Sequence, residues 1–223
     1  NLVGGSNASP GGDCSGECNL IGGNSLSGVC IHGSATASNT VSGNYIGTDV
    51  GGTAAIGNAG AGVSVEDGAG FSLIGGDTPG ESNLVAYNTE HGVAVYGSGS
   101  LYNTITRNSI HDNARMGIEL GDGGNAELAA PVIADFDLDA GTVAGTACAN
   151  CAVEVFSDEG NEGKVYEGRT TANGAGDWAF NRGAPFAGPH LTATATDGAG
   201  NTSEFSEPAP PINTPPTLSG LPD

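Results

Sequence analysis

Two short patterns of polar and apolar positions alternate along the first half of the chain. In one, an asparagine is followed two residues later by an aliphatic residue, at Asn1, Asn19, Asn39, Asn44, Asn83, Asn103 and Asn108. In the other, a glycine leads an aliphatic-x-aliphatic strand, at Gly28, Gly62, Gly92 and Gly117. Short strands that return in a fixed order between glycines are typical of a solenoid, whose units bury their apolar faces against one another. The pattern therefore predicts stacked coils of β-strands.

The spacing of these motifs supports a repeat. Four pairs share one offset of 64 residues, namely Asn19 with Asn83, Gly28 with Gly92, Asn39 with Asn103, and Asn44 with Asn108. A coil then consists of one glycine-led strand and two asparagine strands, and each 64-residue unit holds two coils. Ser72-Leu73-Ile74 replaces one asparagine triplet. We expect about four coils over residues 1–122.

Period-two alternation predicts which side chains point away from the apolar bore. In the glycine-led strands the aliphatic residues point inward. The residues expected to face water are Cys30, His32, Ser64, Glu66, Ala94, Tyr96 and Glu119. Asparagines at the bends beside the bore can satisfy one another and the turn backbone. We therefore expect a structural ladder of side-chain amides at Asn19, Asn39, Asn44, Asn83, Asn103 and Asn108.

The pattern changes near Ala129, where longer strands rich in Thr, Val and aromatic residues begin. Seven strands are expected, at 131–138, 141–147, 152–157, 165–171, 177–180, 191–196 and 202–205. That number and spacing of short strands favours an immunoglobulin-like sandwich with Trp178 in its core. The predicted organisation is a β-helix over 1–128, a sandwich over 129–208, and a proline-rich linker with the start of a further module over 209–223.

The chain is strongly acidic, with 25 Asp and Glu against 5 Lys and Arg and a formal net charge of −20 over 223 residues. Such a surface repels phosphate backbones, which argues against nucleic-acid binding. We expect no direct membrane insertion, because no apolar stretch is long enough to span a bilayer.

The 5 cysteines fit an oxidising compartment. A disulfide between Cys148 and Cys151 is expected across a tight turn. One further pair is expected among Cys14, Cys18 and Cys30. Cys30 is the odd residue, and it could pair with Cys14, with Cys18 or with another molecule.

Two regions carry a resemblance to known families. The run from Asn44 to Asp49, with Gly52 to Asn58 after it, is similar to a motif of bacterial right-handed parallel β-helix repeat proteins. Residues 151–156 and 192–205 look like the bacterial Ig-like domain that often follows such repeats. The resemblance implies an all-β chain, with a short right-handed parallel β-helix of about four coils followed by an Ig-like β-sandwich. It also implies an extracellular location, in a large protein of the bacterial cell surface, an adhesin or a fibre.

Catalysis is one alternative, since parallel β-helices often carry polysaccharide lyases, hydrolases or epimerases on an outward face. The candidate catalytic residues are Glu66, Glu119, His111 and Arg115, of which the last two are expected in the loop after the last asparagine strand. Glycoside hydrolysis needs two carboxyl groups about 5 to 10 Å apart. Glu66 and Glu119 are expected two coils apart, which is marginal. Solvated polar residues on a scaffold are the simpler explanation, so an enzyme is the less favoured interpretation.

Binding is the other alternative. His32, Glu66 and Tyr96 are candidates for contact with carbohydrate. Asp135, Asp137 and Asp139 alternate on one strand, so they are candidate Ca²⁺ ligands, although an exposed acidic edge that resists aggregation explains them more simply.

We therefore expect a structural or adhesive module, whose partners are copies of itself, neighbouring surface modules or extracellular glycans. Asn1 already lies in an expected strand, which suggests an open coil edge and joining of columns end to end.

Overall fold

The first half of the chain is a parallel β-helix. In the computed structural model, which describes residues 1–209, three parallel sheets each contain four strands. The first sheet is formed by β1 (Leu2–Gly4), β4 (Thr40–Ser42), β7 (Leu73–Gly75) and β10 (Thr104–Thr106). The second is formed by β2 (Leu20–Ile21), β5 (Tyr45–Ile46), β8 (Leu84–Ala86) and β11 (Ser109–His111). The third is formed by β3 (Val29–His32), β6 (Val63–Glu66), β9 (Val93–Tyr96) and β12 (Ile118–Gly121).

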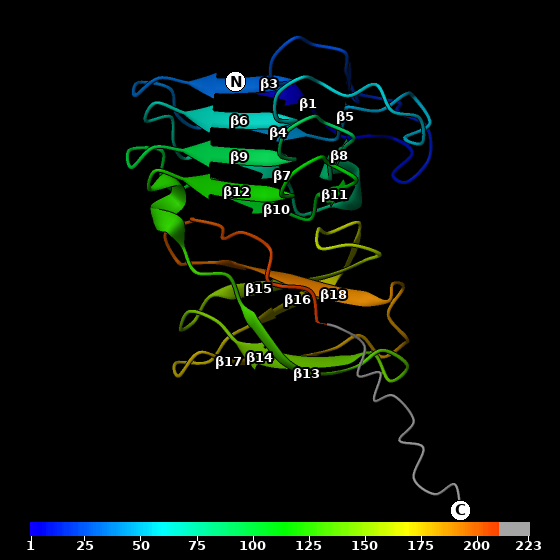
Figure 1. Cartoon of the computed structure of the whole chain (residues 1–223), viewed down its shortest axis with the longest axis vertical. Coiled ribbons are helices and arrows are strands. Elements are labelled where there is room, and N and C mark those ends of the chain that lie inside the picture. The colour runs from blue at the N-terminus through cyan, green and yellow to red at the C-terminus, as the bar shows by residue number, and fades with distance from the viewer. Residues whose placement is uncertain (210–223) are drawn as a thin grey trace, which may run out of the picture.

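The register of the strands confirms the predicted repeat. The chain visits the three sheets in turn, so β3, β6, β9 and β12 stack directly over one another (Figure 1). Val29 pairs with Val63, and Val63 pairs with Val93, so positions 64 residues apart occupy the same place in alternate coils. The aliphatic residues that alternation assigned to the bore form its core, and Val63, Val65, Val93 and Val95 are fully buried.

Asparagine ladders hold the bends between the sheets. The Nδ2 of Asn44 donates to Oδ1 of Asn83 at 3.1 Å, and Asn83 donates in the same way to Asn108 at 2.8 Å. Asn19 continues this ladder at the other end through Asn44. The amides of Asn44, Asn83 and Asn108 also donate to strand carbonyls, as Asn83 does to Val41. Buried polar groups at these bends are thus satisfied within the column.

A second ladder was not visible in the sequence patterns, whereas the interruption of a third row at Ser72 was. Asn24, Asn58, Asn88 and Asn113 form another stack of side-chain amides at the bend after the second sheet. At the bend before the first sheet, Asn39 accepts from Asn1 and Asn103 bonds with Asn125. Ser72 lies between Asn39 and Asn103 in this row, and the Nδ2 of Asn39 is buried without a partner. The shorter serine side chain explains that unpaired amide.

The second half of the described chain is an antiparallel sandwich. One sheet has the order β13 (Val132–Asp137), β14 (Thr142–Thr146), β17 (Asp177–Asn181). The other has the order β16 (Val165–Thr171), β15 (Ala152–Asp158), β18 (His190–Thr196). Val153, Val155, Trp178 and Leu191 lie in the core between the sheets. The sequence-based fold class is therefore confirmed as a β-helix followed by an antiparallel β-sandwich.

The predicted strand at 202–205 is wrong, because this segment makes only an isolated bridge between Thr202 and Thr196. Ser203 Oγ accepts from the backbone N–H of Ala195 at 2.9 Å, and Ser206 Oγ accepts from Ala193 at 3.0 Å. The segment follows β18 with side-chain oxygens in place of part of the carbonyl ladder, which prevents regular pairing.

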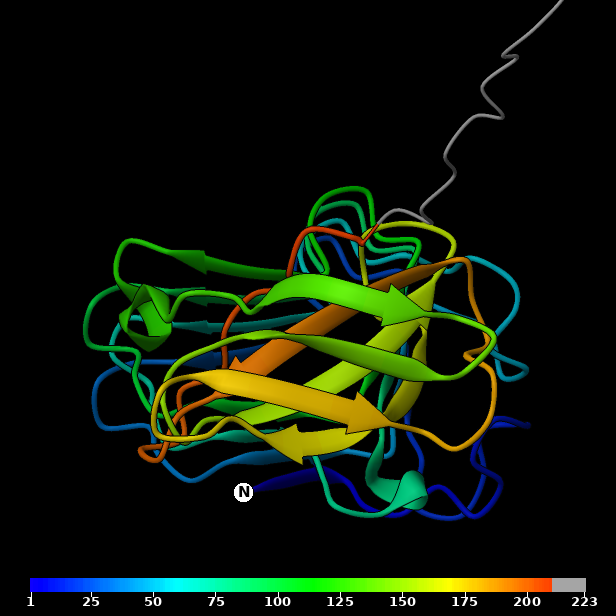
Figure 2. The same cartoon turned by 90° about the horizontal axis from the view of Figure 1, so that it is seen from below.

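The sandwich lies against the end of the β-helix formed by β10, β11 and β12. The sheet containing β15 and β18 is the nearer of the two, so it lies between the β-helix and the sheet containing β13 and β14 (Figure 1). Viewed from below, the sandwich strands cross the end of the column (Figure 2). Both faces of β15 and β18 are consequently buried over most of their length.

Helical structure is limited to two short turns in the described chain, η1 (Pro79–Glu81) and η2 (Gly124–Glu127). Within residues 1–209, no helix has the length and apolar character needed to cross a membrane. The predicted linker and further module at 209–223 lie outside the described residues, apart from Ala209.

Candidate functional site

The outward face of the third sheet contains most of the catalytic and carbohydrate-binding candidates, and we refer to it as the third-sheet face. Its register places Cys30, Ser64, Ala94 and Glu119 in one row. The next outward row begins with His32 and Glu66, and the same register continues it through Tyr96 to Gly121. The structure thus places His32, Glu66 and Tyr96 on successive coils of one face. Whether they bind carbohydrate stays a prediction.

Short polar contacts occupy the part of the third-sheet face formed by β3 and β6. Cys30 Sγ donates to Glu66 Oε1 at 3.0 Å, and Ser64 Oγ lies 3.3 Å from the same oxygen. His32 Nε2 lies 2.6 Å from Asp67 Oδ2. Partial burial raises the pKa of the Cys30 thiol, and the carboxylates of Glu66 and Asp67 add to this effect. A thiol with a raised pKa remains protonated near neutrality and is a weak nucleophile.

Tyr96 in β9 and Glu119 in β12 lie on the same face, nearer to the sandwich (Figure 1). Partial burial raises the pKa of the Tyr96 hydroxyl, and the charge of Glu119 raises it further. A Cβ at Gly121 would lie 2.5 Å from two carbons of the Tyr96 ring, so glycine is needed to leave room for this side chain. Glu119 Oε2 lies 3.9 Å from Nδ1 of the buried His91.

The four catalytic candidates are not brought together. Glu66 and Glu119 lie in different rows of the third-sheet face, whereas His111 ends β11 in the second sheet. The expectation that His111 lies in a loop is wrong, because β11 extends to it and its side chain is buried. Its Nδ1 lies 2.7 Å from Asp112 Oδ2. Arg115 lies 3.6 Å from Glu90. These residues therefore form no shared acid–base arrangement.

The three candidate calcium ligands lie on or just after the edge strand β13, and all three are exposed. Within residues 1–209, no three His, Cys, Asp or Glu side chains are grouped so that they could hold a metal ion. Asp135, Asp137 and Asp139 are thus not gathered as the calcium hypothesis requires. A bulge between Ile133 and Asp135 precedes the three aspartates, so Asp135 and Asp137 keep the expected alternation on β13, whereas Asp139 lies beyond the end of the strand.

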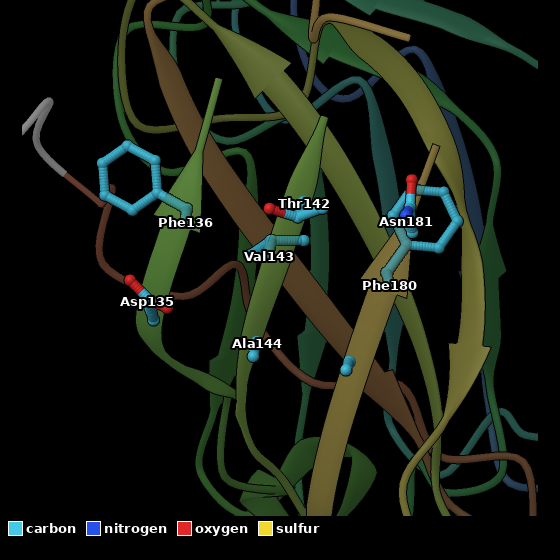
Figure 3. Close-up of a pocket in the computed structure, with 8 residues that line it drawn as sticks. Asp135, Phe136, Thr142, Val143, Ala144, Phe180 and Asn181 are labelled. Carbon is cyan, nitrogen blue, oxygen red and sulfur yellow. The ribbon is translucent and has the colours of Figure 1, made fainter. Parts of the chain in front are cut away.

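Asp135 does line a groove of about 270 Å³ on the sheet formed by β13, β14 and β17 (Figure 3). Phe136, Val143 and Phe180 supply apolar walls, and Thr142 and Asn181 supply polar groups. Figure 3 shows the two aromatic rings on opposite sides of β14. Asp135 is the only ionisable residue in this lining, so the groove contains neither a carboxylate pair nor a compensating cation.

The cysteines form two local disulfides. Cys14 bonds with Cys18 in the long loop after β1, and Cys148 bonds with Cys151 in the turn between β14 and β15. Cys30 is a free thiol on the exposed third-sheet face.

A third region, the junction between the β-helix and the sandwich, was not predicted from the sequence. Three glutamates of the sandwich half each accept a backbone N–H next to or within a different terminal strand. Glu154 Oε2 accepts from Arg107 at 2.9 Å, directly after β10 of the first sheet. Glu162 Oε2 accepts from Asn113 at 3.1 Å, after β11 of the second sheet. Glu204 Oε1 accepts from Leu120 at 2.9 Å, within β12 of the third sheet.

Glu162 continues the second asparagine ladder. Within the column, Asn113 Oδ1 accepts from both the backbone N and the side-chain Nδ2 of Asn88. The two carboxylate oxygens of Glu162 accept from the same two groups of Asn113, each at 3.1 Å. A sandwich side chain therefore takes the position that an asparagine of a further coil would occupy.

Backbone and apolar contacts complete the junction. Ile110 and Gly163 exchange two backbone hydrogen bonds of 2.9 and 2.8 Å, so the sandwich pairs directly with β11. Ile105 donates to Thr202 Oγ1 at 3.0 Å. Phe205 packs against the apolar bore and meets the ring of Phe156 edge to face at a centroid distance of 5.3 Å. The terminal edges of all three sheets are thereby covered.

The burial of these glutamates alters their acidity. Desolvation raises the pKa of Glu162 to about 7, despite its hydrogen bonds from Asn113. Desolvation also raises the pKa values of Glu154 and Glu204, and hydrogen bonds from the β-helix oppose the rise. The sequence carried only an indirect signal, since Glu154 alternates with Val153 and Val155 and so points away from the sandwich core. Alternation does not reveal that a second domain covers that face.

Comparison with known proteins does not assign this chain, since no protein-family model matches it and the search of curated proteins finds no match.

Proposed function

We propose that this chain is a structural module of a secreted bacterial cell-surface protein or extracellular fibre. In this proposal the β-helix is a stiff column, and the sandwich closes its C-terminal end. The supporting observation is the junction, where sandwich groups accept hydrogen bonds from the terminal coil at all three sheets. In stacked repeats, stability is approximately a sum of nearest-neighbour interfaces. A column that continues into a hydrogen-bonded cap is suited to bearing load.

The dispersal of the catalytic candidates supports a structural role over an enzymatic one. Glu66, Glu119, His111 and Arg115 are divided between two sheets and a loop. Each has a polar partner of its own, namely Cys30, His91, Asp112 and Glu90 respectively. A lyase or hydrolase needs its acid and base on one substrate-binding surface. Glycan contact at His32, Glu66 and Tyr96 would add adhesion to the structural role without chemistry.

The junction limits the edges at which identical columns could join end to end. The edges of β10, β11 and β12 face the sandwich, so a second copy cannot pair there while the junction is closed. Contact between copies or with a neighbouring module is therefore proposed for the edge formed by β1, β2 and β3.

The structural proposal can be tested by single-molecule pulling between attachment points at residues 1 and 209. We expect the native chain to unfold in one dominant force event, because the column and the cap share hydrogen bonds. In Phe205→Ala the sandwich is expected to separate first, at lower force. Two independent low-force events in the native chain would contradict the proposal.

A panel of acidic polysaccharides tests the enzymatic alternative in parallel. No depolymerisation is expected. Cleavage of a uronate polymer that is lost in Glu66→Gln or His111→Ala would overturn the structural proposal. For adhesion, binding that is lost in Tyr96→Ala but retained in the control Tyr87→Ala would locate the glycan contact on the third-sheet face.

A further inference from the structure

The junction glutamates are titratable groups that lie in the contact between the β-helix and the sandwich. We propose that Glu154, Glu162 and Glu204 make the contact between the β-helix and the sandwich a proton-dependent clamp, which is tightest in mild acid and weakens toward neutral pH. This inference depends on the junction geometry and not on the proposed structural function.

The geometry places three carboxyl groups where protonation matters. Each one reaches from the sandwich half to the terminal coil, and each meets a different sheet. Glu154 and Glu162 are only 3% and 5% exposed. A buried carboxylate loses its hydration, so its ionised form is costly unless a cation or several donors compensate it. The clamp is therefore built from groups that favour the neutral form when it is closed.

Glu162 is the strongest member because burial removes the hydration of its carboxylate, and its surroundings are acidic as well. Asp158, at the end of β15, and Asp112, directly after β11, both disfavour its ionised form. The two hydrogen bonds from Asn113 favour the ionised form, but burial outweighs them. Asp112 itself lies 2.7 Å from Nδ1 of His111 in β11. Ionising Glu162 thus adds a third negative charge at the contact between β11 and the sandwich.

The other two glutamates have mixed surroundings. Arg169 of β16 and Arg107 of the terminal coil face Glu154 and partly compensate its charge. Glu204 faces Glu119 and Glu127, which disfavour ionisation, and His91, which favours it. Burial is the leading cause at both positions. All three therefore shift in the same direction, with Glu162 expected to dominate.

The sign of the pH effect follows from linkage. A carboxyl whose pKa is raised in the folded protein binds more protons folded than unfolded, so acid stabilises the folded form. For Glu162 this stabilisation is complete below the ordinary carboxyl pKa and is lost as the pH rises through about 7. Asp49, Glu81 and Asp197 have lowered pKa values, so their contribution is lost only at lower pH. The two effects occupy separate pH ranges.

The experiment is urea unfolding of residues 1–223 at about pH 5.5 and about pH 7.5, at fixed ionic strength. The equilibrium constant for unfolding is expected to rise more than about tenfold between these conditions, as linkage predicts for one strongly shifted carboxyl. In Glu162→Gln the rise should be at least about fivefold smaller, since one titrating group is removed. The matched control is Glu159→Gln, which removes an exposed charge from the same β15–β16 loop and should retain the full rise.

Two results would overturn the clamp. One is a native protein whose unfolding constant does not rise between these pH values, which needs no variant. The other is an equal rise in Glu162→Gln and the native protein. If the unfolding constant rises with pH as expected but pulling gives two independent force events, the clamp stands and the proposed structural function is contradicted.

Discussion

Two polar faces of this molecule look alike in the sequence and differ in the structure. The third-sheet face alternates Ser64 and Glu66 with buried valines, and the outer side of β15 alternates Glu154 with Val153 and Val155. Glu66 is partly exposed, whereas Glu154 is only 3% exposed. On β18, Thr192 and Thr194 are buried in the same way, at 0% and 2% exposure. Alternation identifies the side chains that point away from a core, but it does not tell whether they meet water. The sandwich contact buries Glu154, and small residues such as Ser64 and Ala94 are buried on the third-sheet face without such a cover.

The largest contrast between the faces is expected at their aromatic residues. Phe205→Ala removes a ring that packs on both Phe156 and the apolar bore, and should lower the free energy of unfolding by about 3 kcal/mol. Tyr96→Ala on the third-sheet face should cost less than about 1 kcal/mol, as is usual for surface positions. Urea unfolding measures both values. Equal losses would mean that the junction is no better packed than the open face.

A smaller contrast is expected for the glutamates. Glu154→Ala leaves Thr106 Oγ1 and the backbone N–H of Arg107 without their acceptor in a buried site, which should cost about 2 kcal/mol. Glu66→Ala removes contacts with Cys30 and Ser64 on the surface and should cost less than about 0.5 kcal/mol. Thermal and urea unfolding near neutral pH test this pair. If Glu154→Ala leaves the free energy of unfolding unchanged, water must reach the unpaired donors at the junction.

A glycine pair within one loop sharpens the comparison further. A Cβ at Gly163 would lie 2.5 Å from the Phe205 ring, so Gly163→Ala should cost about 1.5 kcal/mol through overpacking. Gly160 belongs to the same loop, and a Cβ there would meet no atom within 4 Å, so Gly160→Ala should leave stability nearly unchanged. The difference in urea midpoint between the two variants is the measurement. Indistinguishable midpoints would show that Phe205 does not rest against Gly163.

The β-helix could be predicted in detail because its rules are local and repeated. The 64-residue offset, the inward valines and an asparagine ladder all follow from strand alternation and bend chemistry within one coil. Asn58, Asn88 and Asn113 escaped notice because they lie outside the Asn-x-aliphatic triplet, and Asn24 alone gave no ladder. Their shared bend appears only when the coils are stacked.

The junction could not be predicted, because its contacts join distant parts of the chain. Glu162 and Asn113 are 49 residues apart, and Glu204 and Leu120 are 84 apart. Nothing near Glu162 in the sequence marks it as the last member of an asparagine ladder. The catalytic hypothesis failed for a different reason. It grouped His111 with Glu66 from their places in the repeat pattern, whereas the structure places them on different sheets.

Amide hydrogen exchange at the terminal coil tests the central claim that the sandwich closes the β-helix. The backbone N–H groups of Ile105, Arg107 and Leu120 donate to Thr202, Glu154 and Glu204 of the sandwich half. The structure predicts that these three amides exchange as slowly as Val63 and Val93, which donate within the column. Exchange at the rate of unprotected loop amides would contradict it.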